Sequence, residues 1–177
     1  MQTFTIPVTE VLGKPGASTE VEVAAPLEGA GTALACLDGT PVRVTGRLDG
    51  VVEGILVAGR AVGSMVARCA RCLDELPSAV ELELCELFVG AGQEADEDAY
   101  RVKGMEIDLE PMLRDAFVLA LPLNPLCRKD CAGLCARCGA NLNNTSCDCV
   151  EETGDPRWAA LDEVRAQLEA ADSPTQG

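Results

Sequence analysis

The sequence contains no histidine, and only 3% of its residues are aromatic. Without an imidazole, neither a Ser-His-Asp triad nor a Cys-His nucleophile pair can exist. The chain is nevertheless 47% hydrophobic, so it can bury a core. Because aromatic residues are scarce, we expect that core to be built from valine, leucine and alanine.

Several other features are also missing. Gly13-Lys14-Pro15-Gly16 is typical of a turn and not of a phosphate-binding loop between a strand and a helix. No apolar run is long enough to span a bilayer, and residues 1–7 lack the basic and apolar regions of a signal peptide. We therefore expect a non-enzymatic, cytoplasmic protein that binds neither a membrane nor a small-molecule substrate. In a reducing cytosol, its ten cysteines favour metal binding over disulfides.

The most specific motif is a Cys-x-x-Cys pair, Cys135 and Cys138, followed by a Cys-x-Cys pair, Cys147 and Cys149. Four thiolates on two tight loops suit a tetrahedral Zn²⁺, and we predict an all-cysteine zinc site here. Gly139 is expected to supply a positive-φ turn after the first pair. The alternative is two local disulfides, which is weaker because Cys-x-Cys closes a small, strained ring.

Four further cysteines form a possible second zinc site. Cys69 and Cys72 are another Cys-x-x-Cys pair, and Cys127 and Cys131 are a Cys-x₃-Cys pair. Cys69 and Cys72 could instead be a redox pair, but that motif should open a helix, and residues 73–77 end in proline too soon. The two remaining cysteines, Cys36 and Cys85, have apolar neighbours, and we expect them to be small core residues.

Charge is unevenly distributed along this acidic chain, whose net charge is −15. Residues 43–72 carry five arginines against two acids, whereas residues 73–100 carry nine acids and no base. Residues 127–149 are also slightly basic. A metal that joined the cysteine-bearing segments would create one basic surface on an acidic body, although four thiolates around each zinc would reduce it. Alternatively, these arginines lie on solvated strand faces.

Alternating apolar and polar residues predict an antiparallel β meander or small barrel. The expected strands are 3–12, 19–26, 42–48, 51–58, 61–67, 80–89 and 101–107, with a hairpin turn at Asp49-Gly50. A helix is expected near 109–121, capped by Asp108, with Met112, Ala116 and Leu119 on the face that packs against the sheet. The predicted fold class is therefore α+β, with a C-terminal zinc-knuckle segment and a terminal helix.

We expect three regions: a β-rich domain over 1–122, a cysteine-rich zinc-binding segment over 123–150, and a helix with a disordered tail over 151–177. The last region contains an apolar stripe of Trp158, Leu161, Val164 and Leu168. This stripe either docks on the body of the protein or anchors a partner. We find no internal repeat.

Several segments of this chain have a characteristic pattern. They are Cys69-Ala70-Arg71-Cys72, Asp108-Leu109-Glu110-Pro111, the run from Gly133 to Asn143, Cys147-Asp148-Cys149 and Asp155-Pro156-Arg157-Trp158. Together they resemble the YceD family, the large ribosomal RNA subunit accumulation proteins, over residues 30–168. The most specific part is Gly-Leu-Cys-x-x-Cys-Gly-x-Asn-Leu-Asn, in which Ala136 replaces a frequent proline.

The resemblance implies a non-enzymatic factor for 23S ribosomal RNA accumulation and large-subunit biogenesis. Its partners would be 23S ribosomal RNA or pre-ribosomal particles, or a ribosomal or processing protein. Basic side chains near the cysteine motifs are the candidate RNA contacts: Arg43, Arg47, Arg68, Arg71, Arg128, Lys129 and Arg137. Two alternatives remain, a zinc-stabilised protein-interaction adaptor that never touches RNA and a zinc-linked thiol redox sensor.

Overall fold

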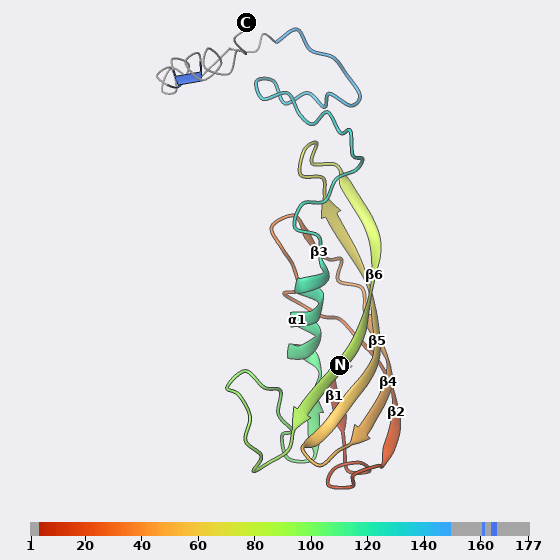
Figure 1. The fold of residues 1–177 in the computed structure, drawn as a ribbon. Coiled ribbons are helices and arrows are strands. Elements are labelled where there is room, and N and C mark those ends of the chain that lie inside the picture. The colour runs from red at the N-terminus through yellow and green to blue at the C-terminus, as the bar shows by residue number, and fades with distance from the viewer. Residues whose placement is uncertain (1–3, 150–160, 162–163, 166–177) are drawn as a thin grey trace, which may run out of the picture. The chain divides into compact units, whose positions relative to one another are not determined.

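The structure is a computed structural model that describes residues 4–149, 161 and 164–165. The chain divides into two compact units, Met1–Gly133 and Leu134–Gly177. The elements of the first unit are β1 (Thr5–Pro7), β2 (Ser18–Ala25), β3 (Ala35–Leu37), β4 (Val42–Gly50), β5 (Gly54–Arg68), β6 (Glu75–Val89), β7 (Glu106–Asp108) and α1 (Glu110–Ala120) (Figure 1). The predicted three-region division stays a prediction.

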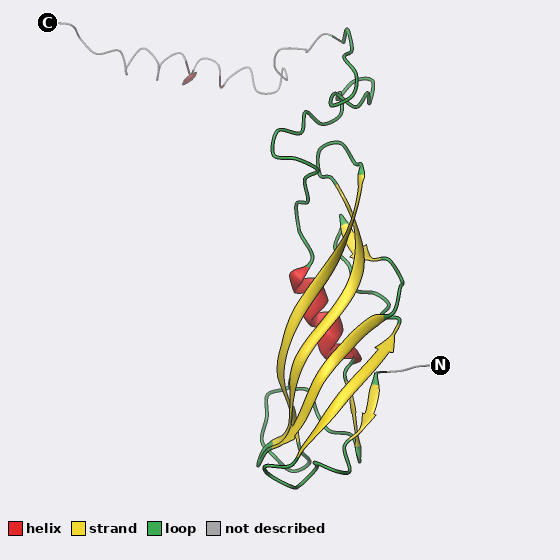
Figure 2. Ribbon diagram, turned by 90° about the vertical axis from the view of Figure 1, so that its right-hand side faces the viewer, coloured by secondary structure: helices red, strands yellow, loops and turns green. Residues whose placement is uncertain are grey.

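The strand β5 is the centre of the larger antiparallel sheet. It pairs with β6 along its whole length, from Gly54↔Val89 to Arg68↔Glu75. The opposite edge of β5 pairs with β4 over residues 55–62 and with β3 over residues 65–67. The strand β2 pairs with the outer edge of β4. A separate two-stranded sheet joins β1 and β7. The helix α1 lies against one face of the larger sheet (Figure 2), so the predicted α+β class with antiparallel sheets and a packing helix is confirmed.

The core of the first unit lies between this sheet and α1. Its largest fully buried side chains include Phe88, Phe117, Leu48 and Ile55. The prediction that Leu119 belongs to the packing face is wrong, because its side chain is 87% exposed. Leu119 follows the buried Phe117 by two residues, which corresponds to a rotation of roughly 200° about the helix axis. Its side chain therefore points towards solvent.

The start of α1 follows the predicted capping chemistry. Asp108 Oδ1 accepts the backbone N–H of Glu110 at 3.0 Å, although Leu109 is the residue that directly precedes the helix. Pro111 lies in the first turn, where its missing N–H has no partner to lose. The short β7 therefore leads into a helix whose first backbone N–H is bonded to Asp108, while the N-cap residue Leu109 supplies no side-chain cap.

The predicted hairpin turn at Asp49-Gly50 is wrong. Both residues belong to β4, and the turn instead runs from Val51 to Gly54, whose backbone groups bond to each other at 3.0 and 3.3 Å. The two strands expected over 51–58 and 61–67 are one continuous strand, β5. The sequence reading also starts β6 too late, because Pro77 lies within it.

Glycine is required at the Gly46↔Gly59 pair, where β4 and β5 lie side by side; this pair is called the Gly46–Gly59 crossing below. A Cβ built on Gly46 would lie 2.7 Å from the Cα of Gly59 and 2.3 Å from the carbonyl oxygen of Ala58. A Cβ built on Gly59 would meet Gly46 in the same way. The two backbones therefore approach so closely that neither position has room for a Cβ.

The expectation that Cys36 and Cys85 lie in the core is wrong, because both are exposed. Cys36 lies between Ala35 and Leu37, and Cys85 follows Leu84, but side chains next to each other on a strand point to opposite faces. Trp158 and Leu168 lie outside the described residues, while Leu161 and Val164 are 54% and 49% exposed. Within the part of the chain that the structure describes, no helix is long and apolar enough to cross a membrane.

Candidate metal centres

The first cysteine group lies at one end of the β5–β6 hairpin. Cys69 and Cys72 occupy the turn between these strands, and Cys127 and Cys131 come from the segment after α1. Cys69, Cys72 and Cys131 are buried, whereas Cys127 is exposed. The fold thus brings together two motifs that are more than fifty residues apart in sequence.

The spacing of the four sulfur atoms fits a metal ion. The Sγ atoms of Cys69 and Cys131 are 3.8 Å apart, and those of Cys72 and Cys127 are 3.6 Å apart. All four Sγ atoms lie within 4.8 Å of one another. A tetrahedral zinc bound at about 2.3 Å would place its sulfur ligands about 3.8 Å apart. The group therefore has the size of a closed four-thiolate site.

Contacts other than the cysteines also fix this arrangement. The backbone N–H of Ala70 donates to the carbonyl of Pro125 at 2.8 Å. The guanidinium of Arg71 donates from Nη1 to the carbonyl oxygen of Cys131 at 2.9 Å. These bonds join the hairpin turn to the segment after α1, so the cysteines are not the only contacts between the two segments.

The second group lies within the second unit, between Leu134 and Cys149. The ligand atoms of Cys135, Cys138, Cys147 and Cys149 again lie within 4.8 Å of one another. The asparagine-rich connection folds back on itself because Asn141 Oδ1 accepts the backbone N–H of Asn143 at 3.0 Å. None of the residues from 134 to 149 is buried, so this group has no hydrophobic core around it.

Within each group, the pKa of one cysteine is lowered and the pKa of other cysteines is raised. Backbone N–H groups of Cys72 and Cys127 lower the pKa of Cys69 to about 6. In the second group, the N–H groups of Cys138 and Arg137 lower the pKa of Cys135 to about 6.

The partner thiols are shifted in the opposite direction. Contacts with Cys138 and Cys135 raise the pKa of Cys149 to about 12, and burial and the Cys131 contact raise that of Cys127. One thiolate forms readily in each group, and further thiolates need a cation beside them. None of the ten cysteines is in a disulfide.

The two groups contain the same tetrapeptide turn, which sequence reading missed. Cys69-Ala70-Arg71-Cys72 and Cys135-Ala136-Arg137-Cys138 are identical, and the residue after each donates its backbone N–H to the first cysteine's carbonyl at 2.9 Å. That residue has φ +62° in Leu73 and +73° in Gly139. The positive φ predicted for Gly139 is therefore confirmed, and a direct comparison of the two Cys-x-x-Cys pairs would have revealed the repeat.

The candidate RNA-binding side chains come from three parts of the chain. Arg68, Arg71, Arg128 and Lys129 lie near the first cysteine group, and Arg137 belongs to the second unit. Arg43 and Arg47 lie on the exposed face of β4. They are neutralised by neighbours, since Arg43 bonds to Glu22 at 2.9 Å and Arg47 to Asp49 at 2.8 Å.

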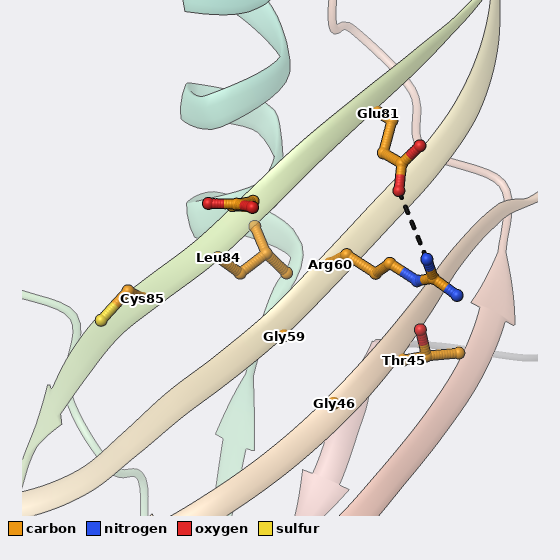
Figure 3. Close-up of a pocket in the computed structure, with 8 residues that line it drawn as sticks. Thr45, Gly46, Gly59, Arg60, Glu81, Leu84 and Cys85 are labelled. Atoms are coloured by element: carbon orange, nitrogen blue, oxygen red, sulfur yellow. Dashed lines mark ion pairs between the residues drawn. The ribbon is translucent and has the colours of Figure 1, made fainter.

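A hollow on the same sheet face shows a similar pairing of charges. It is lined by the Gly46–Gly59 crossing, by Arg60 and by residues of β6. The guanidinium of Arg60 points towards Glu81, with 3.5 Å between Nη1 and Oε1 (Figure 3). Arg43 and Arg60 thus pair with carboxylates of flanking strands and Arg47 with one of its own strand, which lowers their attraction for a polyanion.

Comparison with known proteins adds to this geometry. The family model described as "Large ribosomal RNA subunit accumulation protein YceD" matches residues 57–165. The chain belongs to the YceD family. The matched range includes all eight cysteines of the two groups. No solved structure was found to match this YceD-family chain.

Relatives of this YceD-family chain occur in bacteria and plants. An uncharacterized protein of Mycobacterium tuberculosis is 41% identical over 67% of this chain and 59% of its own length. An uncharacterized protein of Mycobacterium leprae is 34% identical over 96% of this chain and 81% of its own. A protein of Arabidopsis thaliana named "Large ribosomal RNA subunit accumulation protein YCED homolog 1, chloroplastic" is 27% identical over 75% of this chain and 51% of its own.

Proposed function

We propose that this chain is a non-enzymatic, cytoplasmic factor that supports accumulation of 23S ribosomal RNA and hence biogenesis of the large ribosomal subunit. The observation that carries this proposal is the match to the YceD family model over residues 57–165, whose description names accumulation of large ribosomal RNA. The Arabidopsis relative carries the same description in its name.

In this proposal each cysteine group holds one structural Zn²⁺. The ligands are Cys69, Cys72, Cys127 and Cys131 in the first site, and Cys135, Cys138, Cys147 and Cys149 in the second. Four thiolates fill a tetrahedral zinc, so neither ion keeps the open position that catalysis needs. The ions instead hold loops that have little core of their own.

The proposed RNA contacts are the basic side chains around the first site, Arg68, Arg71, Arg128 and Lys129, together with Arg43, Arg47 and Arg137. Paired changes test two of these places in RNA-binding assays, Arg128→Glu with Lys129→Glu and Arg43→Glu with Arg47→Glu. Each pair should weaken binding and leave the melting temperature nearly unmoved, because these side chains are exposed. Unchanged binding would remove that place from the RNA-contacting surface.

The role in the cell is tested by depleting the protein in the cells that make it. The ratio of 23S to 16S ribosomal RNA, and of large to small subunits, should fall. A normal ratio after full depletion would refute the proposal. A version lacking the four thiols of one site should fail to restore the ratio if the role requires that zinc, and should restore it if that zinc is dispensable.

A second candidate function is a protein-interaction adaptor without RNA contact. The net charge of −15 and the carboxylate partners of Arg43 and Arg47 favour it. An adaptor should keep its ribosomal partners in a pull-down after nuclease treatment, whereas an RNA-bound factor should lose them.

A further inference from the structure

The strand β6 has one edge that the rest of the described chain leaves almost open. One edge pairs with β5 throughout. On the other, Val89 donates its N–H to the carbonyl of Tyr100 at 2.8 Å and accepts the N–H of Val102 at 3.0 Å. Within residues 4–149, no other backbone hydrogen bond reaches this edge between Glu81 and Leu87.

The ladder geometry identifies which backbone groups face outwards. In an antiparallel pair, N–H and C=O groups of alternate residues point to the partner and away from it. The backbone N–H and C=O of Val89 point away from β5, and the register between the two strands is unbroken from Val89 back to Glu75. The residues with outward backbone groups are therefore Leu87, Cys85, Glu83 and Glu81. Pro77 has the same parity, so its missing N–H costs the β5 ladder nothing.

Acidic side chains surround this edge, and they determine which charge a segment must carry to pair with it. Glu81, Glu83 and Glu86 are exposed on β6, and because Glu81 is paired with Arg60 at 3.5 Å, Glu83 and Glu86 are the carboxylates that carry the selection. Residues 73–100 contain nine acids and no base. A second copy of the same edge would place carboxylate rows beside each other, which is unfavourable. A polyanion such as RNA would be repelled in the same way.

We propose that the open edge of β6, from Glu81 to Leu87, accepts an extended, lysine- or arginine-rich segment of a partner protein as an added strand. The outward N–H and C=O groups supply the backbone bonds, and the carboxylates on and beside the strand select basic side chains. This surface uses none of the cysteine ligands, so the inference stands apart from the role in ribosomal RNA accumulation.

Amide hydrogen exchange on the full, zinc-loaded chain tests the proposal, with an alternating lysine–valine peptide as the probe. The outward amides of Glu81, Glu83 and Leu87 should exchange quickly alone and about tenfold or more slowly with peptide. The amides of Leu82 and Leu84, already bonded to β5, should not change. A lysine–valine peptide interrupted by proline is the matched control. Equal protection by that control, protection by single-stranded RNA, or no protection at all would overturn the proposal.

Two variants separate strand addition from general charge attraction. Glu83→Pro removes one outward N–H at a position of the same parity as Pro77, and it should abolish peptide binding without unfolding the sheet. Glu83→Gln with Glu86→Gln should weaken binding about tenfold, whereas Glu20→Gln with Glu22→Gln on β2 should not. Equal weakening by both glutamine pairs would reduce the effect to net charge and refute the edge site.

Discussion

At the scale of single residues, Leu73 and Gly139 occupy the same position in two identical turns. Both have positive φ, yet only Gly139 lacks the Cβ that makes this conformation costly. Leu73 is the one residue other than glycine with positive φ in the described part of the chain, and its side chain is 53% exposed. The first turn therefore carries backbone strain that the second avoids.

Leu73→Gly should stabilise the zinc-loaded protein by about 0.5–1 kcal/mol, because relief of the left-handed strain exceeds the extra freedom that glycine gives the unfolded chain. Urea unfolding measures the change. The reciprocal variant, Gly139→Leu, should weaken metal retention in the second site. Lower stability of Leu73→Gly would mean that contacts of the leucine side chain outweigh its strain.

Arg71 is expected to control how long the first site retains its metal. Its guanidinium bonds to the carbonyl of Cys131 and brings a positive charge beside a cluster that carries −2 when four thiolates bind zinc. Arg71→Met should therefore accelerate metal loss from the first site about tenfold. A colorimetric chelator follows the release.

The matched control for this prediction is Arg68→Met, which removes an exposed arginine paired to Glu75 at 3.7 Å. Such surface pairs contribute little, so release should stay near the wild-type rate. Equal acceleration by both variants would show that only the general charge of this end of the hairpin matters.

At the scale of elements, the Gly46–Gly59 crossing decides whether β4 and β5 can pair as they do. Gly59→Ala places a Cβ 2.4 Å from the carbonyl oxygen of Thr45, and backbone cannot move aside as a side chain can. We expect a loss of about 2 kcal/mol or more in unfolding free energy, measured by thermal or urea unfolding. Thr45→Ala, on the solvent side of the same strand pair, should change stability by less than about 0.5 kcal/mol.

The elements also show how far sequence patterns reach. Alternation predicts β2, β4 and β6 because each has one apolar and one polar face. Alternation also places Cys85 with Glu81 and Glu83 on the polar face of β6, so the core expectation for Cys85 is wrong because it followed the apolar neighbours instead of the period of two. The Asp49-Gly50 prediction fails because the pairing with β2 and β5 carries β4 through those two residues.

For the candidate sites, the local sequence spacing predicts all four ligands of the second cysteine group but groups only two of the four ligands of the first. Cys135 and Cys149 lie in one short segment, so their grouping can be read directly. By contrast, spacing leaves Cys69 and Cys72 either as a redox pair or as half of a metal site. The backbone bond from Ala70 to Pro125 and the Arg71–Cys131 bond bring Cys127 and Cys131 to them, and no sequence pattern encodes such long-range contacts.

At the scale of the whole molecule, the two units should respond differently to metal removal. The first has a core of buried residues between sheet and helix, whereas no described residue from 134 to 149 is buried. A strong chelator should therefore unfold residues 134–149 and leave the amides of β4 and β5 protected from hydrogen exchange. Retained protection over 134–149 without metal would contradict this prediction.

Acid should release the metal in a defined direction. The pKa values of Cys69 and Cys135 are lowered to about 6 from 9.0. A thiolate with a depressed pKa contributes its stabilisation at high pH and loses it as the pH falls through the depressed value. Zinc affinity, measured by competition with a chelator, should therefore weaken as the pH falls, because protons compete with the metal for every thiol of each group. An affinity that does not change with pH would contradict the thiolate assignment.

The two cysteine groups also differ in how much of the chain must be synthesised before each can form. Cys69 and Cys131 are 62 residues apart, so on a ribosome the first site cannot close until almost the entire first unit has been synthesised. The second needs only the short stretch that ends at Cys149, and it can take up metal as soon as that stretch emerges. A nascent chain that stops before Cys127 would present Cys69 and Cys72 with no partners. Metal held by all four cysteines of the first group would thus require a chain in which β5, β6 and α1 have already been synthesised.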